Sequence, residues 1–267
     1  MQDTTVAERA GGFDPRYVPA LASAEDRHFW FVARNAAITA LARQIVADFP
    51  IGFRALEAGC GTGTTLRALR AACGGDRVFG IDLFREGLIY ARRRNGAVVV
   101  QADLRRAPFP SDVRFHLVAA LDVVEHLADD VATLRDLRAL IASGGALLVT
   151  VPADPGLWSY FDEAAHHCRR YTAAALRSRL SEAGYDIEYL TAFMTPLYPL
   201  MWAWRRSLGV VQRPAADGPL EDLRVIPGIN GALRWMLAWE PRVLAARRKL
   251  PFGTSLVAIA RPATQVC

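Results

Sequence analysis

The chain has 267 residues, of which 52% are hydrophobic and 22% are charged, and its net charge is +5 at pH 7. This composition predicts a globular protein with a buried core and excludes a mainly disordered chain. The longest uncharged apolar run, residues 190–204, is too short to span a bilayer and is broken by prolines. The first residues lack the apolar core of a signal peptide, so we expect a cytoplasmic protein.

Apolar side chains recur at helical spacing over residues 16–49, which predicts one or two helices ahead of the first strand. Strands and helices then alternate regularly. Strands are predicted at 53–59, 77–82, 97–103, 114–122 and 144–152, with helices at 64–73, 85–94 and 131–141. Such alternation predicts parallel strands in a doubly wound α/β sheet of the Rossmann type.

The pattern continues with a predicted helix at 173–184 and strands at 185–193 and 254–261, which completes seven strands. We therefore divide the chain into an N-terminal helical cap (1–50), an α/β core (51–194), a helical insertion (195–253) and a final strand with its tail (254–267). The insertion holds four of the six tryptophans and nine basic against four acidic residues, and this excess of 9 − 4 = 5 equals the whole net charge. The cysteines Cys60, Cys73, Cys168 and Cys267 show no metal-binding spacing and are expected to be reduced thiols.

A glycine-rich turn, E-A-G-C-G-T-G at 57–63, follows the first predicted strand. In a doubly wound sheet this turn faces the ligand, and glycines at alternate positions let the ligand approach the backbone. A dinucleotide fingerprint would place a third glycine or an alanine at residue 64, where this chain has threonine. The carboxylate of Glu57 would repel a pyrophosphate, whereas it suits a ligand with ammonium and sulfonium charges.

Acidic residues end the next three strands as well, namely Asp82, Asp103 and Asp122. Asp82 is placed to accept hydrogen bonds from ribose hydroxyls, and Asp103 from an adenine amine. A single acid at a strand end is ordinarily a cap. Acids at four consecutive strand ends, together with the glycine-rich turn, predict one nucleoside site.

These motifs resemble the class I S-adenosylmethionine-dependent methyltransferases over about residues 28–194. The resemblance assigns 57–63 to motif I, 80–82 to the ribose acid, 101–103 to the adenine contact and L-D-V-V-E-H-L (121–127) to motif IV. It implies S-adenosylmethionine as the cofactor and S-adenosylhomocysteine as its product. Within the family, the E-H-L sequence and the aromatic helix with an arginine resemble the ubiquinone-pathway O-methyltransferases.

The resemblance also implies that Trp30 and Arg34 cover the methionine end of the cofactor, with Arg34 pairing its carboxylate. The expected cofactor-binding residues are Trp30, Arg34, Glu57, Gly59, Cys60, Gly61, Gly63, Asp82, Leu83, Asp103, Leu104, Asp122 and Val123. No metal site is expected, although carboxylates and imidazoles of residues 162–167 are types that bind divalent ions.

Methyl transfer to a hydroxyl needs a base beside the acceptor, and histidine is the usual choice. His126 follows the fourth strand and either acts as the base or only packs. His166 and His167 follow the fifth strand and either contact the acceptor or join a network that ties Arg169, Arg170 and Tyr171 to the sheet. If 162–171 is helical, Asp162 and His166 share one face at i, i+4 spacing, and the carboxylate would orient the imidazole. The expected acceptor contacts are Trp158, Tyr160, Arg170 and Tyr171.

The insertion predicts either a lid over an apolar acceptor, a segment lying on an anionic membrane, or a solvated helical cap. We expect a hydroxyl acceptor that is small or lipid-like, such as a natural product, a quinone or a polyprenyl compound. Nitrogen or carbon methylation and a non-catalytic cofactor-binding protein remain alternatives. A nucleic-acid partner is not expected, because the aromatic residues fall at helical packing intervals. The sequence leaves the oligomeric state open.

Overall fold

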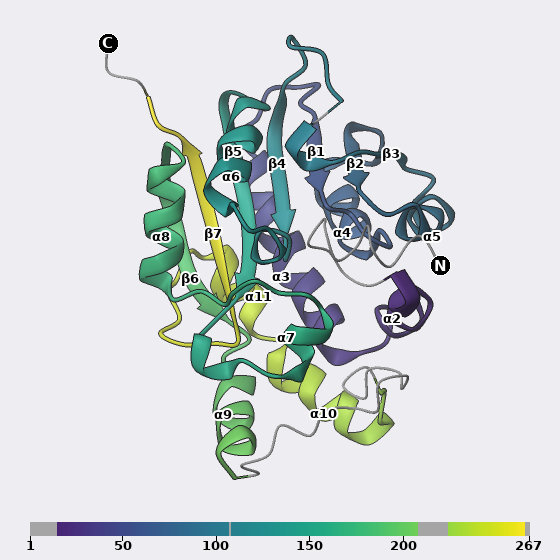
Figure 1. Ribbon diagram of the computed structural model, residues 1–267, viewed down its shortest axis with the longest axis vertical. Coiled ribbons are helices and arrows are strands. Elements are labelled where there is room, and N and C mark those ends of the chain that lie inside the picture. The colour runs from purple at the N-terminus through teal and green to yellow at the C-terminus, as the bar shows by residue number, and fades with distance from the viewer. Residues whose placement is uncertain (1–14, 107, 208–223, 265–267) are drawn as a thin grey trace.

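The computed structural model describes residues 15–106, 108–207 and 224–264, which form a seven-stranded sheet with helices on both faces (Figure 1). The strands lie in the order β3-β2-β1-β4-β5-β7-β6. Their bounds are β1 Ala55–Ala58, β2 Val78–Asp82, β3 Val98–Gln101, β4 Phe115–Leu121, β5 Ile141–Pro152, β6 Tyr185–Phe193 and β7 Ser255–Pro262. The predicted seven-stranded Rossmann-like fold is confirmed.

Helices pack on both faces of the sheet and bury two separate apolar cores. Their bounds are α2 Val18–Ala24, α3 Phe29–Val46, α4 Thr64–Cys73, α5 Arg85–Asn95, α6 Asp130–Ala139, α7 Tyr160–Ala164, α8 Ala173–Glu182, α9 Leu197–Ser207, α10 Pro227–Leu237 and α11 Glu240–Ala245. On one face, α3, α4 and α5 contribute Leu41, Leu69 and Leu88 to the core. On the other, α6 and α8 contribute Leu134 and Leu176.

The last strand departs from the all-parallel arrangement that the alternating pattern predicts. β7 lies between β5 and β6 and runs antiparallel to both. Ser255, its first residue, pairs with Pro152 and Phe193, which end those two strands. After β6 the chain passes through α9, α10 and α11 and re-enters the sheet at the end where β6 finished. Because no crossover carries the chain to the opposite ends of the strands, β7 runs in the opposite direction.

Element ends agree best with the sequence where caps and glycines mark them. Helix α4 has its predicted bounds and lies between Gly63 and Gly74. Helix α8 begins after Thr172, whose side chain accepts a hydrogen bond from the backbone of Ala175. Residues 162–171 do not form one helix, which was the condition for pairing Asp162 with His166, because α7 ends at Ala164 and His166 adopts a left-handed backbone with φ of 54°.

Two polar side chains, the half-buried Asn230 and the buried Glu240, help to hold the insertion to the rest of the fold. Asn230 on α10 accepts a hydrogen bond from the backbone of Phe29 and donates one to the carbonyl of Arg27, so it fixes α10 to the junction between α2 and α3. The carboxylate of Glu240, which is 2% exposed, accepts hydrogen bonds at 2.7 Å from the backbone amides of Met194 and Thr195. These contacts join α11 to the segment that follows β6.

Replacing Glu240 tests this second attachment. Glu240→Ala leaves two backbone amides without their acceptor, and we expect the free energy of unfolding to fall by about 1 to 3 kcal/mol. Denaturant titration followed by circular dichroism measures the change. Glu182→Ala is the matched control, because Glu182 is 53% exposed and forms only surface ion pairs. We expect it to change stability by less than about 0.5 kcal/mol, and an equal loss in both variants would contradict the assigned role.

Candidate functional site

The glycine-rich loop between β1 and α4 has the conformation that a close ligand approach requires. Gly59, Gly61 and Gly63 adopt left-handed backbones with φ of 80°, 49° and 81°. A Cβ atom on Gly59 would lie 2.5 Å from Cγ2 of Val123, the residue that follows the end of β4 by two positions. Glycine is therefore required at position 59, both by its backbone and by the space available.

Asp82, at the end of β2, braces this loop. Its Oδ2 accepts a hydrogen bond from the Gly61 amide at 2.7 Å, and its Oδ1 accepts one from the Phe84 amide at 2.8 Å. Burial raises the pKa of the Asp82 carboxyl, while these backbone donors act against that increase. The side chain thus holds the loop and the end of β2 in register, and its binding of ribose hydroxyls stays a prediction.

Glu57 is a buried carboxyl group that forms no ion pair among the described residues, although the Thr65 side chain and the charge of Arg34 act to lower its pKa. It is 0% exposed, and neither of its oxygens has a hydrogen-bond partner among the described residues. Burial raises its pKa to about 8, so the group is largely protonated at pH 7. A buried acid without an ion pair next to a bare-backbone loop fits a cationic ligand, and this is the chemistry that S-adenosylmethionine would bring.

Arg34 and Asp122 form an ion pair beside the loop. Nη2 of Arg34, on α3, lies 2.5 Å from Oδ2 of Asp122, which follows β4 with an unusual φ of 55°. The guanidinium also lies 5.3 Å from the ring centre of Trp30. Its Nε has no hydrogen-bond partner within the described part of the chain. Arg34 thus retains a donor, and its pairing with a cofactor carboxylate stays a prediction.

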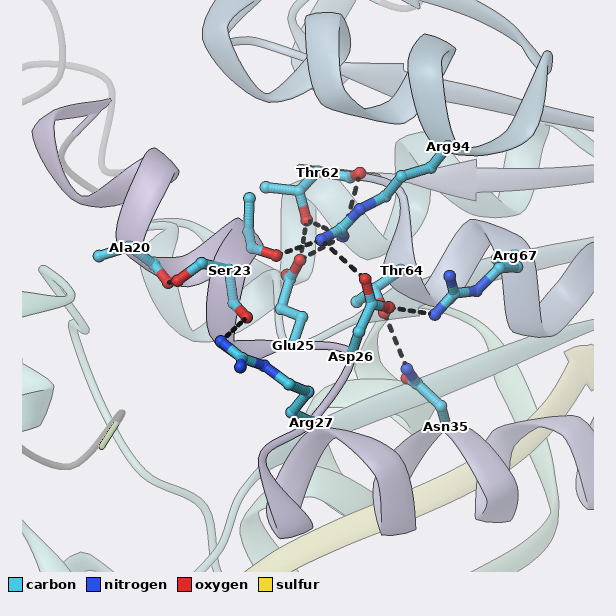
Figure 2. A network of polar contacts seen from close by, with 11 residues as sticks. Ala20, Ser23, Glu25, Asp26, Arg27, Asn35, Thr62, Thr64, Arg67 and Arg94 are labelled. Atoms are coloured by element: carbon cyan, nitrogen blue, oxygen red, sulfur yellow. Dashed lines mark hydrogen bonds and ion pairs between the residues drawn. The ribbon is translucent and has the colours of Figure 1, made fainter. Parts of the chain in front are cut away.

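A network that sequence analysis missed ties α2 to the glycine-rich loop (Figure 2). The buried carboxylate of Glu25 contacts both the hydroxyl of Thr62 in the loop and the guanidinium of Arg94 on α5. Arg94 also donates to the carbonyl of Ala22. Glu25 and Asp26 lie between two helices, where acidic residues are commonly helix caps. Only the burial of Glu25 in the folded protein reveals its contact with the loop.

The remaining residues expected to bind the cofactor lie around the same edge of the sheet. Cys60 is 3% exposed and packs under Gly80, where a Cβ atom would lie 2.8 Å from its Sγ. Asp103 forms an ion pair with Arg105 at 2.7 Å, so its carboxylate is already engaged. The Leu83 carbonyl accepts a hydrogen bond from Gln101, and Leu104 begins a short 3-10 helix. Their contacts with adenine or ribose stay predictions.

The structure pairs Asp162 with His167 instead of His166. Because α7 stops at Ala164, the i, i+4 contact proposed for His166 does not form. The Nδ1 atom of His167 lies 2.8 Å from Oδ1 of Asp162, and Nε of Arg170 lies 2.7 Å from the same oxygen. Burial alone would raise the pKa of Asp162, but the hydrogen bond with His167 and the charge of Arg170 outweigh it and hold the pKa at about 2.

Glu125 and His126 occupy a short 3-10 helix, Val124–His126, next to this pair. The rings of His126 and His167 lie 4.7 Å apart. Burial lowers the pKa of His126 to about 3, which makes it a weak proton acceptor. Glu125 is fully buried, its oxygens have no hydrogen-bond partner among the described residues, and burial raises its pKa strongly.

One atom from each of Glu125, His126 and His167 lies within 4.8 Å of the others, a spacing that a divalent ion could bridge. This set differs from the acids and histidines of 162–167 that the sequence singled out for such an ion. The expectation that the protein has no metal site stays untested.

The predicted acceptor contacts divide into two groups. Trp158 is 39% exposed and Tyr160 is half-buried, so both can reach a ligand. By contrast, Tyr171 is 2% exposed and its hydroxyl donates to Asp130, which also pairs with Arg169 at 2.7 Å. Arg170 is held by Asp162. The structure thus contains the network that was the alternative interpretation of these residues, and their contact with an acceptor stays a prediction.

The sheet order, the glycine loop and the acids behind it define a class I S-adenosylmethionine-dependent methyltransferase. A family model described as a methyltransferase domain matches residues 25–190. The chain belongs to this family. The expectations of an S-adenosylmethionine-dependent enzyme with that cofactor are confirmed.

Curated relatives agree with this assignment. The chain is 29% identical, over 82% of its length and 72% of theirs, to proteins named "Probable S-adenosylmethionine-dependent methyltransferase" in two strains of Mycobacterium tuberculosis. It is 32% identical to a trans-aconitate 2-methyltransferase from Rhizobium etli, over 47% of this chain and 50% of that one.

Solved structures share the fold. One is a methyltransferase in complex with the Haloferax volcanii Trm112 methyltransferase activator (TM-score 0.59, 20% identity, 94% of this chain and 98% of that one). Another is the [4+2]-cyclase SpnF (TM-score 0.57, 20% identity, 88% and 84%). At this identity the likeness concerns the fold alone.

The raised pKa of Glu57 predicts proton release when the cofactor binds. In the free protein the group is protonated at pH 7, and a nearby positive charge favours its ionised form. We expect calorimetry in buffers of different ionisation enthalpy to show release of up to one proton that Glu57→Gln does not show. Because S-adenosylmethionine has a titrating amine of its own, the difference between the two proteins is the measured quantity. Equal proton release in both would contradict this role.

The same carboxyl predicts how stability depends on pH without the cofactor. A carboxyl whose folded pKa of about 8 exceeds its ordinary value of 4.5 contributes stability below the lower value. This contribution is lost as the pH rises from 4.5 through 8. We expect the free energy of unfolding of the wild type to fall relative to that of Glu57→Gln as the pH rises through this range. Denaturant titration at several pH values measures this difference. A difference independent of pH would contradict the raised pKa.

Asp82→Ala tests the loop brace. The variant loses the acceptor of the Gly61 amide and the predicted ribose acceptor, so we expect affinity for S-adenosylhomocysteine to weaken by about 1 to 3 kcal/mol. Isothermal titration calorimetry measures it, with Asp76→Ala as a control on the exposed turn after α4. Unchanged affinity in Asp82→Ala would show that the ribose binds elsewhere.

Proposed function

We propose that the protein methylates a hydroxyl group of a small or lipid-like acceptor, with His167 as the base. The observation that carries this proposal is the 2.8 Å contact between Nδ1 of His167 and the buried carboxylate of Asp162. A carboxylate accepts hydrogen bonds, so Nδ1 is the donor in this contact, and in a neutral imidazole Nε2 then keeps its lone pair. This arrangement orients an imidazole for proton abstraction.

The electrostatics of the neighbouring groups favour His167 over His126. A pKa of about 3 leaves His126 with little tendency to take a proton. Asp162, with a pKa of about 2, stays ionised at any working pH and stabilises the imidazolium that forms on His167. Arg170 contacts the same carboxylate oxygen and keeps it in place.

In the proposed reaction, bound S-adenosylmethionine supplies an electrophilic methyl group. His167 would accept the acceptor's hydroxyl proton at Nε2 as the oxygen forms its bond to the methyl carbon; the bond between that carbon and the sulfur breaks, and S-adenosylhomocysteine leaves. Glu57 faces the positive charge of the cofactor, while Arg34 and Trp30 bind its methionine end. The glycine loop and α2, which the Glu25–Thr62 contact holds together, orient the nucleoside and exclude water.

The hydroxyl acceptor rests on the resemblance of Glu125-His126-Leu127 and the aromatic helix to the ubiquinone-pathway O-methyltransferases. The family match does not reach this subgroup. A lipid-like acceptor is supported by the exposed Trp158 and by the tryptophan-rich insertion. The insertion lies near α7, because Arg205 of α9 donates a hydrogen bond to the hydroxyl of Ser159, the residue that precedes α7. A nucleic-acid acceptor is not part of the proposal. An activator like the Trm112 protein of the Haloferax complex is a partner that a co-purification experiment can seek.

Paired variants test the base. His167→Asn removes the proton acceptor, and we expect kcat to fall by about 100-fold or more on a hydroxyl acceptor, while affinity for S-adenosylhomocysteine stays unchanged. His166→Asn is the matched comparison, because asparagine tolerates the left-handed backbone of residue 166. Turnover is followed as formation of S-adenosylhomocysteine across a panel of phenols, polyprenyl alcohols and amines.

Three outcomes would overturn the proposal. One is a large loss in His166→Asn with full activity in His167→Asn. A second is turnover of amines only. A third is tight cofactor binding without turnover of any acceptor, which would favour a cofactor-binding protein without catalytic activity.

A further inference from the structure

We propose that the exposed sides of α9 and α10 bind the surface of an anionic phospholipid bilayer. We use the name aromatic-basic face for the exposed side chains at this end of the molecule: Leu200 and Trp204 on one side of α9, Trp202 and Arg206 on its other side, and Ile229, Arg234 and Trp235 on α10. Both helices lie at the same end of the long axis of the molecule (Figure 1). This inference does not depend on the acceptor or the base proposed above.

The face exposes large apolar side chains to an extent that folding alone does not explain. Trp235 is 82% exposed, Trp204 69% and Trp202 45%, while Ile229 and Leu200 are 57% and 52% exposed. Eight of the thirteen exposed large hydrophobic side chains of the described residues lie between positions 200 and 252. Concentration of apolar side chains in one region of a surface marks an interaction site.

Both helices are fixed to the fold, so their exposure is a property of the packed structure. In α10, Leu237 is 1% exposed and packs in the core shared with α3, and Asn230 bonds to the backbone of Arg27 and Phe29. In α9, Leu197 is 4% exposed, and Arg205 donates to the hydroxyl of Ser159. The apolar side chains of the face are thus exposed on helices that these contacts hold in place.

The charge of the face identifies the kind of partner. Neither helix contains an aspartate or a glutamate, whereas together they carry Arg205, Arg206 and Arg234. The guanidinium of Arg206 lies 4.6 Å from the ring centre of Trp202, so cation and indole are presented together. At a bilayer interface indole rings occupy the headgroup level, and arginines pair with anionic headgroups. This complementarity favours an anionic lipid surface over an apolar protein groove.

The contact is peripheral. Among the described residues, no helix is both long and apolar enough to cross a membrane. Helix α9 has 11 residues, which gives a length of about 17 Å against about 30 Å of hydrocarbon. The two helices would therefore lie in the headgroup layer, with their tryptophans at the acyl boundary.

The experiment is flotation of the full chain with vesicles of phosphatidylcholine alone or with about one third phosphatidylglycerol, chosen to give a clearly negative surface. Wild type is expected to float with the anionic vesicles only, with a blue shift of its tryptophan fluorescence. In the double variant Trp204→Ala/Trp235→Ala and in Arg206→Gln/Arg234→Gln, we expect the vesicle affinity to fall by roughly tenfold or more. Ile51→Ala is the matched control, since Ile51 is 99% exposed and lies outside the face.

Folding of each variant is checked by its affinity for S-adenosylhomocysteine, to which the face does not contribute. Absence of flotation in the wild type, or unchanged flotation in both double variants, would overturn the proposal. Equal binding to both vesicle types would refute the anionic headgroup as the ligand. Light scattering without lipid tests a different occupant: a dimer that the tryptophan variant dissociates would assign the face to a second copy of the chain.

Discussion

The site depends on acidic groups withdrawn from water at the carboxyl ends of neighbouring parallel strands. The strands β1, β2 and β4 end side by side, and Glu57, Asp82 and Asp122 lie at or directly after their ends. Glu57 is fully buried and the other two are partly buried, so each is stabilised by being protonated, bonded to the backbone or paired with a cation. Asp82 takes the backbone of the loop, Asp122 takes Arg34, and Glu57 has neither. Glu57 is therefore the group for which we predict contact with the positive charge of the cofactor.

Much of this arrangement could be predicted from local sequence. The periodic strands and helices and the E-A-G-C-G-T-G turn are short-range signals, and helix α4 has the predicted bounds because glycines flank it. The antiparallel β7 could not be predicted in this way, because its direction depends on where the insertion returns the chain. The partner of Asp162 depends likewise on where α7 ends, and the sequence pattern does not identify Ala164 as its last residue.

The polar residues that connect distant segments outside the motifs were the least predictable. Glu25, Asn230 and Glu240 act between segments that are far apart in the sequence, and each has the residue type of an ordinary surface position. Their contacts connect the cap, the cofactor loop and the insertion to one another. The division into cap, core, insertion and final strand describes the sequence, but these contacts join residues from different segments of it.

The position of β7 has a consequence for how the chain acquires its fold. This strand is made after α9, α10 and α11, yet it lies inside the sheet, with β5 on one side and β6 on the other. Until it arrives, both neighbours present unpaired backbone groups on apolar strands, the kind of edge that recruits other chains. A nascent or truncated polypeptide ending before Ser255 would thus be prone to aggregation, and its survival in the cell would rest on chaperones.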